Sequence, residues 1–196
     1  MNPSQKLNKL FEHYKKNRAE IKYRLSEFKQ IRKDKEQFRE LCFCLLTANT
    51  SAKMGIKIMD EVGDIIFTGS EEEIKERLNH LRCRFYNRRA HYIYHAQKIP
   101  LKLERDYLVK NIKGFGYKES SHFLRNIGHT NYAILDKHIL FFLKEYDIIK
   151  EIPKSLNKKN YEEIEDKMKT WSKDINIPFD ELDLVLWSMK TGEILK

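Results

Sequence analysis

A short helix, a sharp turn and a second helix can be read from the stretch Leu108-Val-Lys-Asn-Ile-Lys-Gly-Phe-Gly-Tyr-Lys-Glu-Ser-Ser-His-Phe-Leu-Arg-Asn-Ile-Gly128. Apolar residues at helical spacing mark the inner faces of the two helices: Leu108, Ile112, Leu124 and Ile127. Two glycines flank Phe115, so the backbone can turn sharply while the phenyl ring enters the core. Gly128 is a typical helix stop. We expect this hairpin to occupy about residues 106–127.

The turn between these helices predicts a site for an anion. Backbone N–H groups at Gly114, Gly116 and the start of the second helix point outward, and a helix N-terminus attracts negative charge. A DNA phosphate suits such a site, and the pattern is that of a helix-hairpin-helix motif, which grips the DNA backbone without reading its sequence. A Gly-x-Gly triplet alone is a weak signal, and its place between two amphipathic helices strengthens it.

Composition and charge restrict the fold and the partner. The chain has 196 residues with 38 Lys and Arg against 29 Asp and Glu, so its formal net charge of +9 favours a polyanionic partner. Seven Gly and four Pro are too few for a fold rich in tight β-hairpins. No strand-like alternation and no Gly-x-Gly-x-x-Gly or Walker loop occurs. No apolar run is long enough to cross a membrane, so we expect an intracellular, cytoplasmic protein.

Helical periodicity recurs along the rest of the chain, which predicts an all-α protein. Apolar stripes begin near Leu7, Phe38, Ile74, Tyr161 and Phe179, and residues 154–159 are expected to be a surface connection. We expect two helical lobes with a cleft between them. The helical barrel would comprise residues 34–127, and the other lobe would comprise residues 1–33 and 128–196.

The first candidate catalytic residue is Lys118, at the start of the second hairpin helix. A cation there is unfavourable with the helix dipole, so we expect this position to favour the neutral amine. A neutral amine can attack an electrophilic carbon. The alternative is an ordinary phosphate-binding lysine.

The second candidate is Asp136, which lies 18 residues further on and would cap the next helix. A helix over residues 118–127 is about 15 Å long. The eight residues that follow can span up to about 26 Å, so the chain can return and bring the carboxylate beside the amine. Such a pair could activate the amine and stabilise a sugar cation. A plain N-cap is the alternative.

Residues 82–92 interleave four arginines with aromatic side chains. Arginine and aromatic groups together suit phosphate contacts and base stacking. We select Arg84, Phe85 and Arg89 as candidates for DNA binding. A solvated basic helix face is the alternative.

The quoted motifs together resemble the helix-hairpin-helix superfamily of base-excision DNA glycosylases. The resemblance rests on Gly114-Phe-Gly-Tyr-Lys118, Asp136-Lys-His138, Arg84-Phe-Tyr-Asn87-Arg-Arg-Ala90 and Leu45-Leu-Thr-Ala-Asn49-Thr-Ser51. The branches with a C-terminal iron–sulfur cluster fit poorly, because the three cysteines are Cys42, Cys44 and Cys83. The compact length and the ending Trp187-Ser-Met-Lys-Thr-Gly-Glu-Ile-Leu-Lys196 resemble the type-2 8-oxoguanine DNA glycosylases. One departure is that the loop before Asp136 lacks the usual proline.

The resemblance implies a bifunctional DNA repair enzyme. Lys118 would attack the sugar C1′, release 8-oxoguanine, form a Schiff base and nick the strand by β-elimination (AP lyase activity), while Asp136 would stabilise the sugar cation. Side chains that would hold the damaged base are Trp187, Met189 and Lys196. Side chains and backbone that would contact DNA are Asn49, Arg84, Phe85 (as a wedge), Arg89, Gly114, Gly116 and His138. For several of these a structural role is the alternative: a helix cap for Asn49, core packing for Trp187 and Met189, a first-turn position for His138, and a frayed tail for Lys196.

The expected partner is double-stranded DNA that contains 8-oxoguanine, bound by a monomer near the nucleoid of a prokaryote and without any membrane. No metal, iron–sulfur cluster or other cofactor is expected, although carbonyls of residues 111–116 could hold a monovalent cation. Three alternatives remain open from the residues: a glycosylase for another oxidised base, a non-catalytic helix-hairpin-helix DNA-binding module, and an RNA-binding helical domain.

Overall fold

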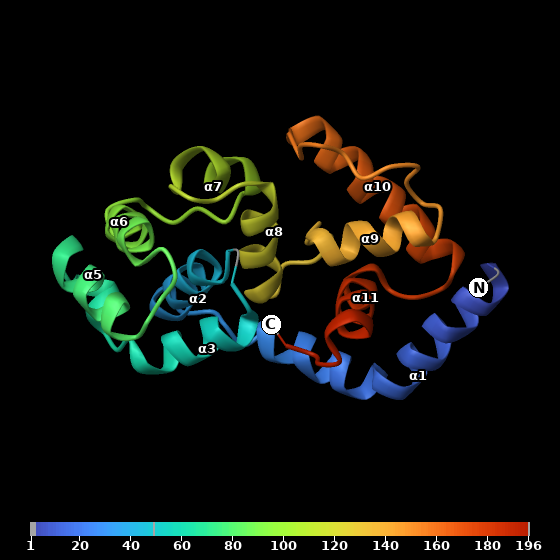
Figure 1. Ribbon diagram of the computed structural model, residues 1–196, viewed down its shortest axis with the longest axis horizontal. Coiled ribbons are helices and arrows are strands. Elements are labelled where there is room, and N and C mark those ends of the chain that lie inside the picture. Colours follow the sequence, from blue (N-terminus) through green and yellow to red (C-terminus); the bar gives the residue numbers. More distant parts are fainter. Residues whose placement is uncertain (1–2, 49, 196) are drawn as a thin grey trace. The chain divides into compact units, whose positions relative to one another are not determined.

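The computed structural model describes residues 3–48 and 50–195, and every regular element in that part of the chain is a helix (Figure 1). The all-α prediction is confirmed. The helices are α1 (Pro3–Phe28), α2 (Asp34–Thr47), α3 (Ala52–Glu61), α4 (Ile65–Thr68), α5 (Glu71–His80), α6 (Tyr86–Ala96), α7 (Arg105–Asn111), α8 (Tyr117–Asn126), α9 (Lys137–Glu145), α10 (Lys158–Asp174) and α11 (Phe179–Thr191).

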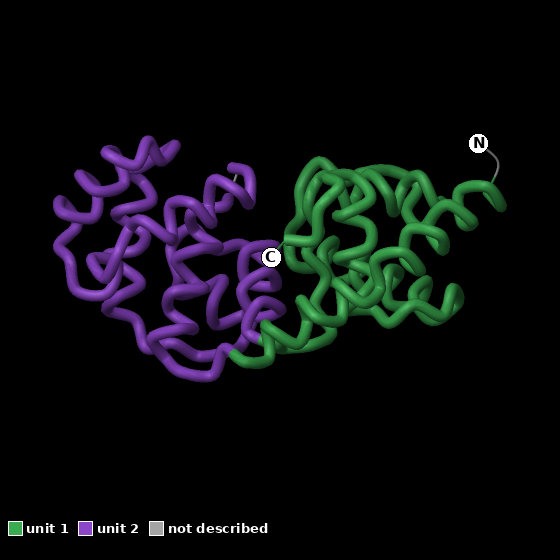
Figure 2. The backbone as a smooth tube through the Cα atoms, turned by 90° about the horizontal axis from the view of Figure 1, so that it is seen from below, with its two compact units in different colours: residues 1–30, 128–196 green, residues 31–127 purple. Residues whose placement is uncertain are grey.

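The chain divides into two compact units, which Figure 2 colours separately. Unit 2 is Ile31–Ile127, and unit 1 combines Met1–Gln30 with Gly128–Lys196. The hairpin is therefore the last part of unit 2 in sequence. The chain that follows it forms unit 1 together with the N-terminal helix.

Unit 2 is built around α2, whose residues from Glu40 to Leu46 are all buried. Helices α3, α6 and α8 pack against it, and α5 covers α6. A buried hydrogen bond joins two of these helices, because Asn126 Nδ2 in α8 donates to Glu40 Oε1 in α2 at 2.6 Å. The second hairpin helix is thereby fixed to the centre of its own unit.

Unit 1 is built around α11, which α1, α9 and α10 contact. Two polar contacts join α1 to α11. His13 Nε2 lies 2.9 Å from Ser188 Oγ, and the Tyr14 hydroxyl donates to Glu181 Oε2 at 2.6 Å. The first and last helices of the chain thus form one packed layer.

Local signals in the sequence account for several helix ends. Ser70 caps α5 through a capping box with Glu73. Gly128 follows α8 with φ of +86°, and a Cβ there would lie 2.8 Å from Lys29 Cα. One boundary differs, because α10 begins at Lys158 inside the stretch expected to be a surface connection. The Asn157 side chain explains this earlier start, since it accepts a hydrogen bond from the Asn160 amide at 3.0 Å.

Cys42, Cys44 and Cys83 are all free and buried. Burial raises the pKa of the Cys42 thiol well above its ordinary value, so this side chain packs as an apolar group. No helix among the described residues is long and apolar enough to span a bilayer.

Candidate active site

The hairpin between α7 and α8 has the geometry expected from its two glycines. Gly114 has φ of +87°, and a Cβ at this position would lie 2.4 Å from Tyr92 Cδ2. Only glycine fits both the backbone angle and the space. Phe115 is buried, with its ring centroid 6.2 Å from that of Phe123, so the turn is anchored in the core of unit 2 as predicted.

Lys118 is the second residue of α8 and is half-buried. Its Nζ lies 3.0 Å from Glu119 Oε1, while Glu119 Oε2 accepts a hydrogen bond from the Gly116 amide at 3.3 Å. One carboxylate therefore caps the helix and pairs with the candidate nucleophile. The Gly116 amide, expected to face a phosphate, donates to this carboxylate in the structure.

Asp136 is the N-cap of α9, as its position in the sequence predicted. Its Oδ1 accepts hydrogen bonds from the amides of His138 and Ile139, each at 2.8 Å. The carboxylate is half-buried, and its orientation is set by these two donors. His138 lies in the first turn of α9 and is also half-buried.

The segment before Asp136 is held by polar side chains of α10 and α11. The amides of Ala133, Ile134 and Leu135 donate to Glu165 Oε1, Asp183 Oδ1 and the Tyr161 hydroxyl at 2.8, 3.1 and 3.2 Å. All six residues are buried. The candidate carboxylate thus follows a rigidly bonded stretch of backbone.

The arginine-rich loop separates into exposed and buried side chains. Phe85 is 49% exposed and adopts a left-handed backbone conformation, φ +59°, directly before α6. The Arg84 guanidinium carbon lies 4.6 Å from the centroid of the Phe85 ring. A bulky residue in this conformation is strained, and such strain concentrates at functional sites.

Arg89 differs from the expectation that it contacts DNA. Its guanidinium is buried and donates to Ala48 O, Thr50 Oγ1 and Cys83 Sγ. These bonds hold Ala48 and Thr50 to α6, and the buried guanidinium does not present its charge to a partner. Arg89 is buried because it lies on the same helical face as Ile93, which is fully buried.

The candidates for base recognition occupy the end of α11. Trp187 and Met189 are both half-buried, so neither is a plain core residue. In the segment that follows α11, Ile194 is buried. Lys196 and Asn49, which were also selected, lie outside the described residues.

Sequence reasoning missed three polar side chains that bond next to the candidate residues in their own units: Glu119, Glu165 and Asp183. Glu119 lies three positions after Gly116, which is the spacing of a capping box. Glu165 lies four positions after Tyr161, on the apolar face of α10, and Asp183 interrupts the apolar run of α11. An acid on a buried helix face was the signal that could have identified the last two.

No group of three or more His, Cys, Asp or Glu that could hold a metal ion occurs within the described ranges. The fold and the hairpin, with a lysine in the first turn after Gly-Phe-Gly and an aspartate capping the next helix, define a helix-hairpin-helix protein of the DNA glycosylase class.

Comparisons with known proteins narrow this class. The sequence model of the 8-oxoguanine DNA glycosylase family matches residues 21–177, and the chain belongs to that family. It is 47% identical to an 8-oxoguanine DNA glycosylase/AP lyase of Korarchaeum cryptofilum over 90% of each chain. It is 44% identical to another of the same name from Methanocaldococcus jannaschii, over 90% of this chain and 91% of that one.

A solved structure agrees with these relatives. The M. jannaschii 8-oxoguanine glycosylase/lyase, crystallised with a 15mer DNA containing 8-oxoguanine, superposes with a TM-score of 0.91 at 41% identity. The match covers 98% of this chain and 100% of that chain. The helical architecture is therefore that of the family throughout.

Proposed function

We propose that this protein excises 8-oxoguanine from duplex DNA and then nicks the strand at the resulting site. Family membership supports this activity. The observation that carries it is the half-buried Lys118 amine in the first turn of α8, directly after the Gly114-Phe115-Gly116 turn. A phosphate clamp needs only backbone amides there, whereas a covalent mechanism needs an amine.

The lysine performs the bond exchange at the sugar. The lesion nucleotide leaves the base stack, because C1′ cannot be reached inside the duplex. Lys118 Nζ attacks C1′, the N-glycosidic bond breaks, and the base departs with its bonding electrons and takes up a proton. Loss of a proton from the amine and opening of the sugar ring yield a Schiff base between Nζ and C1′. Removal of a proton from C2′ then expels the 3′ phosphate by β-elimination.

Asp136 supplies negative charge while the glycosidic bond breaks. The sugar carries positive charge at that stage, and a fixed carboxylate stabilises it without reorganising. The two amide donors at the start of α9 hold Asp136 in one orientation, which suits this task. The mechanism requires no resident cofactor.

The remaining candidates form the contacts to the base and the duplex. Trp187 and Met189 offer half-buried apolar surface for the excised base, and Lys196 follows at the C-terminus. Phe85 presents an exposed aromatic ring directly before α6, which suits a wedge between base pairs. Positive charge and hydrogen-bond donors for phosphates come from Arg84, His138 and the amides at the start of α8.

Borohydride trapping tests the proposal. The protein is mixed with a duplex that contains one 8-oxoguanine, and borohydride reduces any Schiff base to a stable adduct. We expect an adduct and a nicked strand with 8-oxoguanine and neither with an undamaged duplex. Trapping on an oxidised pyrimidine alone would favour a glycosylase for another lesion. Tight DNA binding without any adduct would favour a non-catalytic module, and preferential binding of RNA would overturn the DNA assignment.

A further inference from the structure

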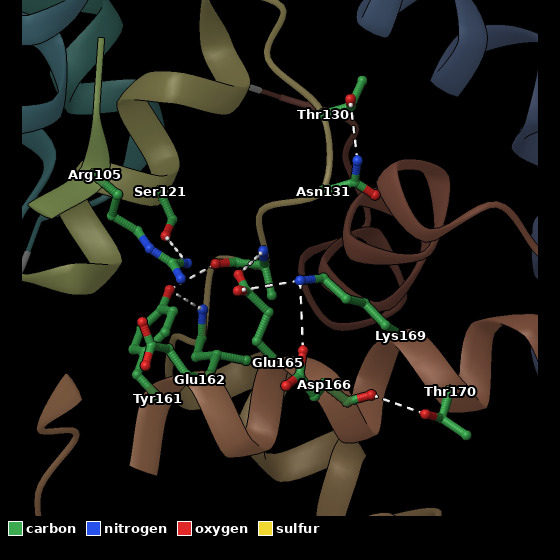
Figure 3. A network of polar contacts seen from close by, with 12 residues as sticks. Arg105, Ser121, Thr130, Asn131, Tyr161, Glu162, Glu165, Asp166, Lys169 and Thr170 are labelled. Carbon is green, nitrogen blue, oxygen red and sulfur yellow. Dashed lines mark hydrogen bonds and ion pairs between the residues drawn. The ribbon is translucent and has the colours of Figure 1, made fainter. Parts of the chain in front are cut away.

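Three consecutive backbone amides before Asp136 donate to side chains rather than to other backbone. Ala133 donates to Glu165, Ile134 to Asp183 and Leu135 to Tyr161. Figure 3 shows Tyr161 and Glu165 rising from α10 toward this segment, with Lys169 beside the Glu165 carboxylate. The segment belongs to neither a helix nor a sheet. Its direction is therefore set by these side chains.

Tyr161 holds the segment at two points. Its hydroxyl donates to the Ala133 carbonyl at 2.6 Å and accepts from the Leu135 amide at 3.2 Å. The side chain is fully buried, so water does not compete for these bonds. One hydroxyl thus fixes the spacing between the two peptide groups that enclose Ile134.

Two buried carboxylates also bond to this segment. Tyr161, Glu165 and Asp183 together are called the clamp from here on. Glu165 and Asp183 are each 3% exposed, and a buried carboxylate is unfavourable unless donors surround it. Lys169 Nζ lies 3.4 Å from Glu165 Oε2 and offsets part of its charge. A neutral acceptor such as a glutamine would satisfy a backbone amide without a buried charge. The use of charge gives stronger hydrogen bonds and a stiffer segment.

The clamp is joined directly to the candidate catalytic carboxylate. The Asp136 amide donates to the Ile134 carbonyl at 2.7 Å, and Asp136 Oδ1 accepts from the amides of His138 and Ile139, the second and third residues of α9. The amides of residues 133–136, His138 and Ile139 are therefore all hydrogen-bonded within unit 1. Loosening the clamp would move the carboxylate through this short chain of bonds.

We propose that Tyr161, Glu165 and Asp183 are positioning residues for the reaction, which set the orientation of Asp136 through the backbone of residues 133–135. The inference rests on the proposed function, because it assigns them a role only if Asp136 acts on the sugar. A purely structural role would lower stability and leave the chemical step of the folded molecules unchanged. Positioning alters the rate constant of that step.

The test uses the full-length protein with the substitutions Tyr161→Phe, Glu165→Leu and Glu165→Gln. Tyr161→Phe removes only the bridging hydroxyl, and Glu165→Leu leaves the Ala133 amide without its acceptor. Glu165→Gln keeps an acceptor oxygen and should restore most of the rate. The matched control is Tyr14→Phe, which removes another hydroxyl of unit 1 that bonds to a buried carboxylate, Glu181, away from the clamp.

Single-turnover base release with saturating 8-oxoguanine duplex separates the two roles. The amplitude reports the active fraction, and the rate constant reports the geometry of the folded enzyme. We expect Tyr161→Phe and Glu165→Leu to reduce the rate constant by about 10- to 100-fold, as a displacement near 1 Å does. The dissociation constant for DNA should remain unchanged, and Tyr14→Phe should retain the wild-type rate constant.

Hydrogen exchange provides a measurement that does not depend on activity. The amides of residues 133–135 should exchange faster in Tyr161→Phe than in the wild type, while those of α2 in unit 2 remain protected. Equal rate constants in the wild type and Tyr161→Phe would overturn the inference alone, as would equal slowing by Tyr14→Phe. A wild-type protein that releases no base would instead overturn the proposed function, and the inference with it.

Discussion

The Lys118 amine lies 3.0 Å from a carboxylate oxygen of its neighbour Glu119, and the other oxygen of that carboxylate accepts the Gly116 amide. The proposed nucleophile is therefore tied to the end of its own helix. The amine must leave this ion pair before it can bond to a sugar. The hairpin consequently links backbone geometry, local charge and the proposed chemistry within four residues, Gly116 to Glu119.

Lys118→Gln should abolish both the borohydride adduct and strand nicking, because the amide cannot form a Schiff base. DNA binding should persist, with a salt slope that falls by at most about 0.9 for the one lost charge. Lys167→Gln, on the exposed face of α10, is the matched control and should nick DNA normally. Nicking by purified Lys118→Gln would remove this lysine from the mechanism.

Glu119→Gln should tighten DNA binding by about two- to fivefold, because it removes one negative charge beside the amides proposed to face a phosphate. The variant keeps an oxygen that can accept the Gly116 amide, so α8 should still form. Fluorescence anisotropy with undamaged duplex at several salt concentrations measures the effect. Glu163→Gln, in α10, changes the net charge equally and should leave the affinity unaltered. Equal affinities of Glu119→Gln and the wild type would contradict the prediction.

Gly114→Ala should lower the free energy of unfolding by about 2 kcal/mol or more, from the left-handed φ together with a Cβ clash. Gly63→Ala separates these two effects within the same unit. Gly63 has a similar φ of +72°, yet nothing lies within 4 Å of the position that its Cβ would take. Urea denaturation of both variants gives the comparison. If Gly114→Ala is as stable as Gly63→Ala, the Tyr92 ring must move to make room for the methyl group, and the predicted clash is wrong.

The stability of the protein should decrease as the pH falls below about 6.5, and His13 should contribute to the decrease. Burial lowers the pKa of His13 from 6.5, and the nearby cations Lys16 and Lys9 lower it further. The unfolded chain therefore binds the proton more readily than the folded protein, so this stability is present above pH 6.5 and is lost as the pH falls through the folded value.

His13→Gln should reduce the loss of Tm between pH 7 and pH 5, because glutamine can still bond to Ser188 and does not titrate. Thermal unfolding at a series of pH values measures this. His80→Gln, at the exposed end of α5, is the control and should follow the wild-type curve. If His13→Gln loses more Tm than the wild type over this pH range, the direction assigned to the pKa shift of His13 is wrong.

The hairpin and the caps were predictable because their causes are local. The Gly114-Phe115-Gly116 triplet, the Ser70 capping box and the Asp136 N-cap each depend on residues within a few positions of one another. The apolar stripes of the long helices are similarly local, since they follow from 3.6 residues per turn. The catalytic roles of Lys118 and Asp136 stay predictions until the variants are measured.

Arg89 and Glu165 show where this kind of reasoning fails. Arg89 was read as part of a basic surface, yet it is buried against Ala48 and Thr50, about forty residues away in the sequence. Glu165 lies on the apolar face of α10, and its partner is the Ala133 amide, in a segment with no regular structure. The pattern of charged residues along a helix does not show which distant backbone group a side chain will bond to.

The amino-acid sequence by itself determined the helical class, the hairpin and the two residues proposed for catalysis, because helix periodicity, glycine geometry and capping act over a few neighbouring residues. Only the folded chain shows that Arg89 bonds to Ala48 and Thr50 and that Glu119 pairs with Lys118. It also shows that the segment before Asp136 is held by Tyr161, Glu165 and Asp183. These contacts depend on how helices pack and on which polar groups are buried together, and a linear pattern carries no record of either.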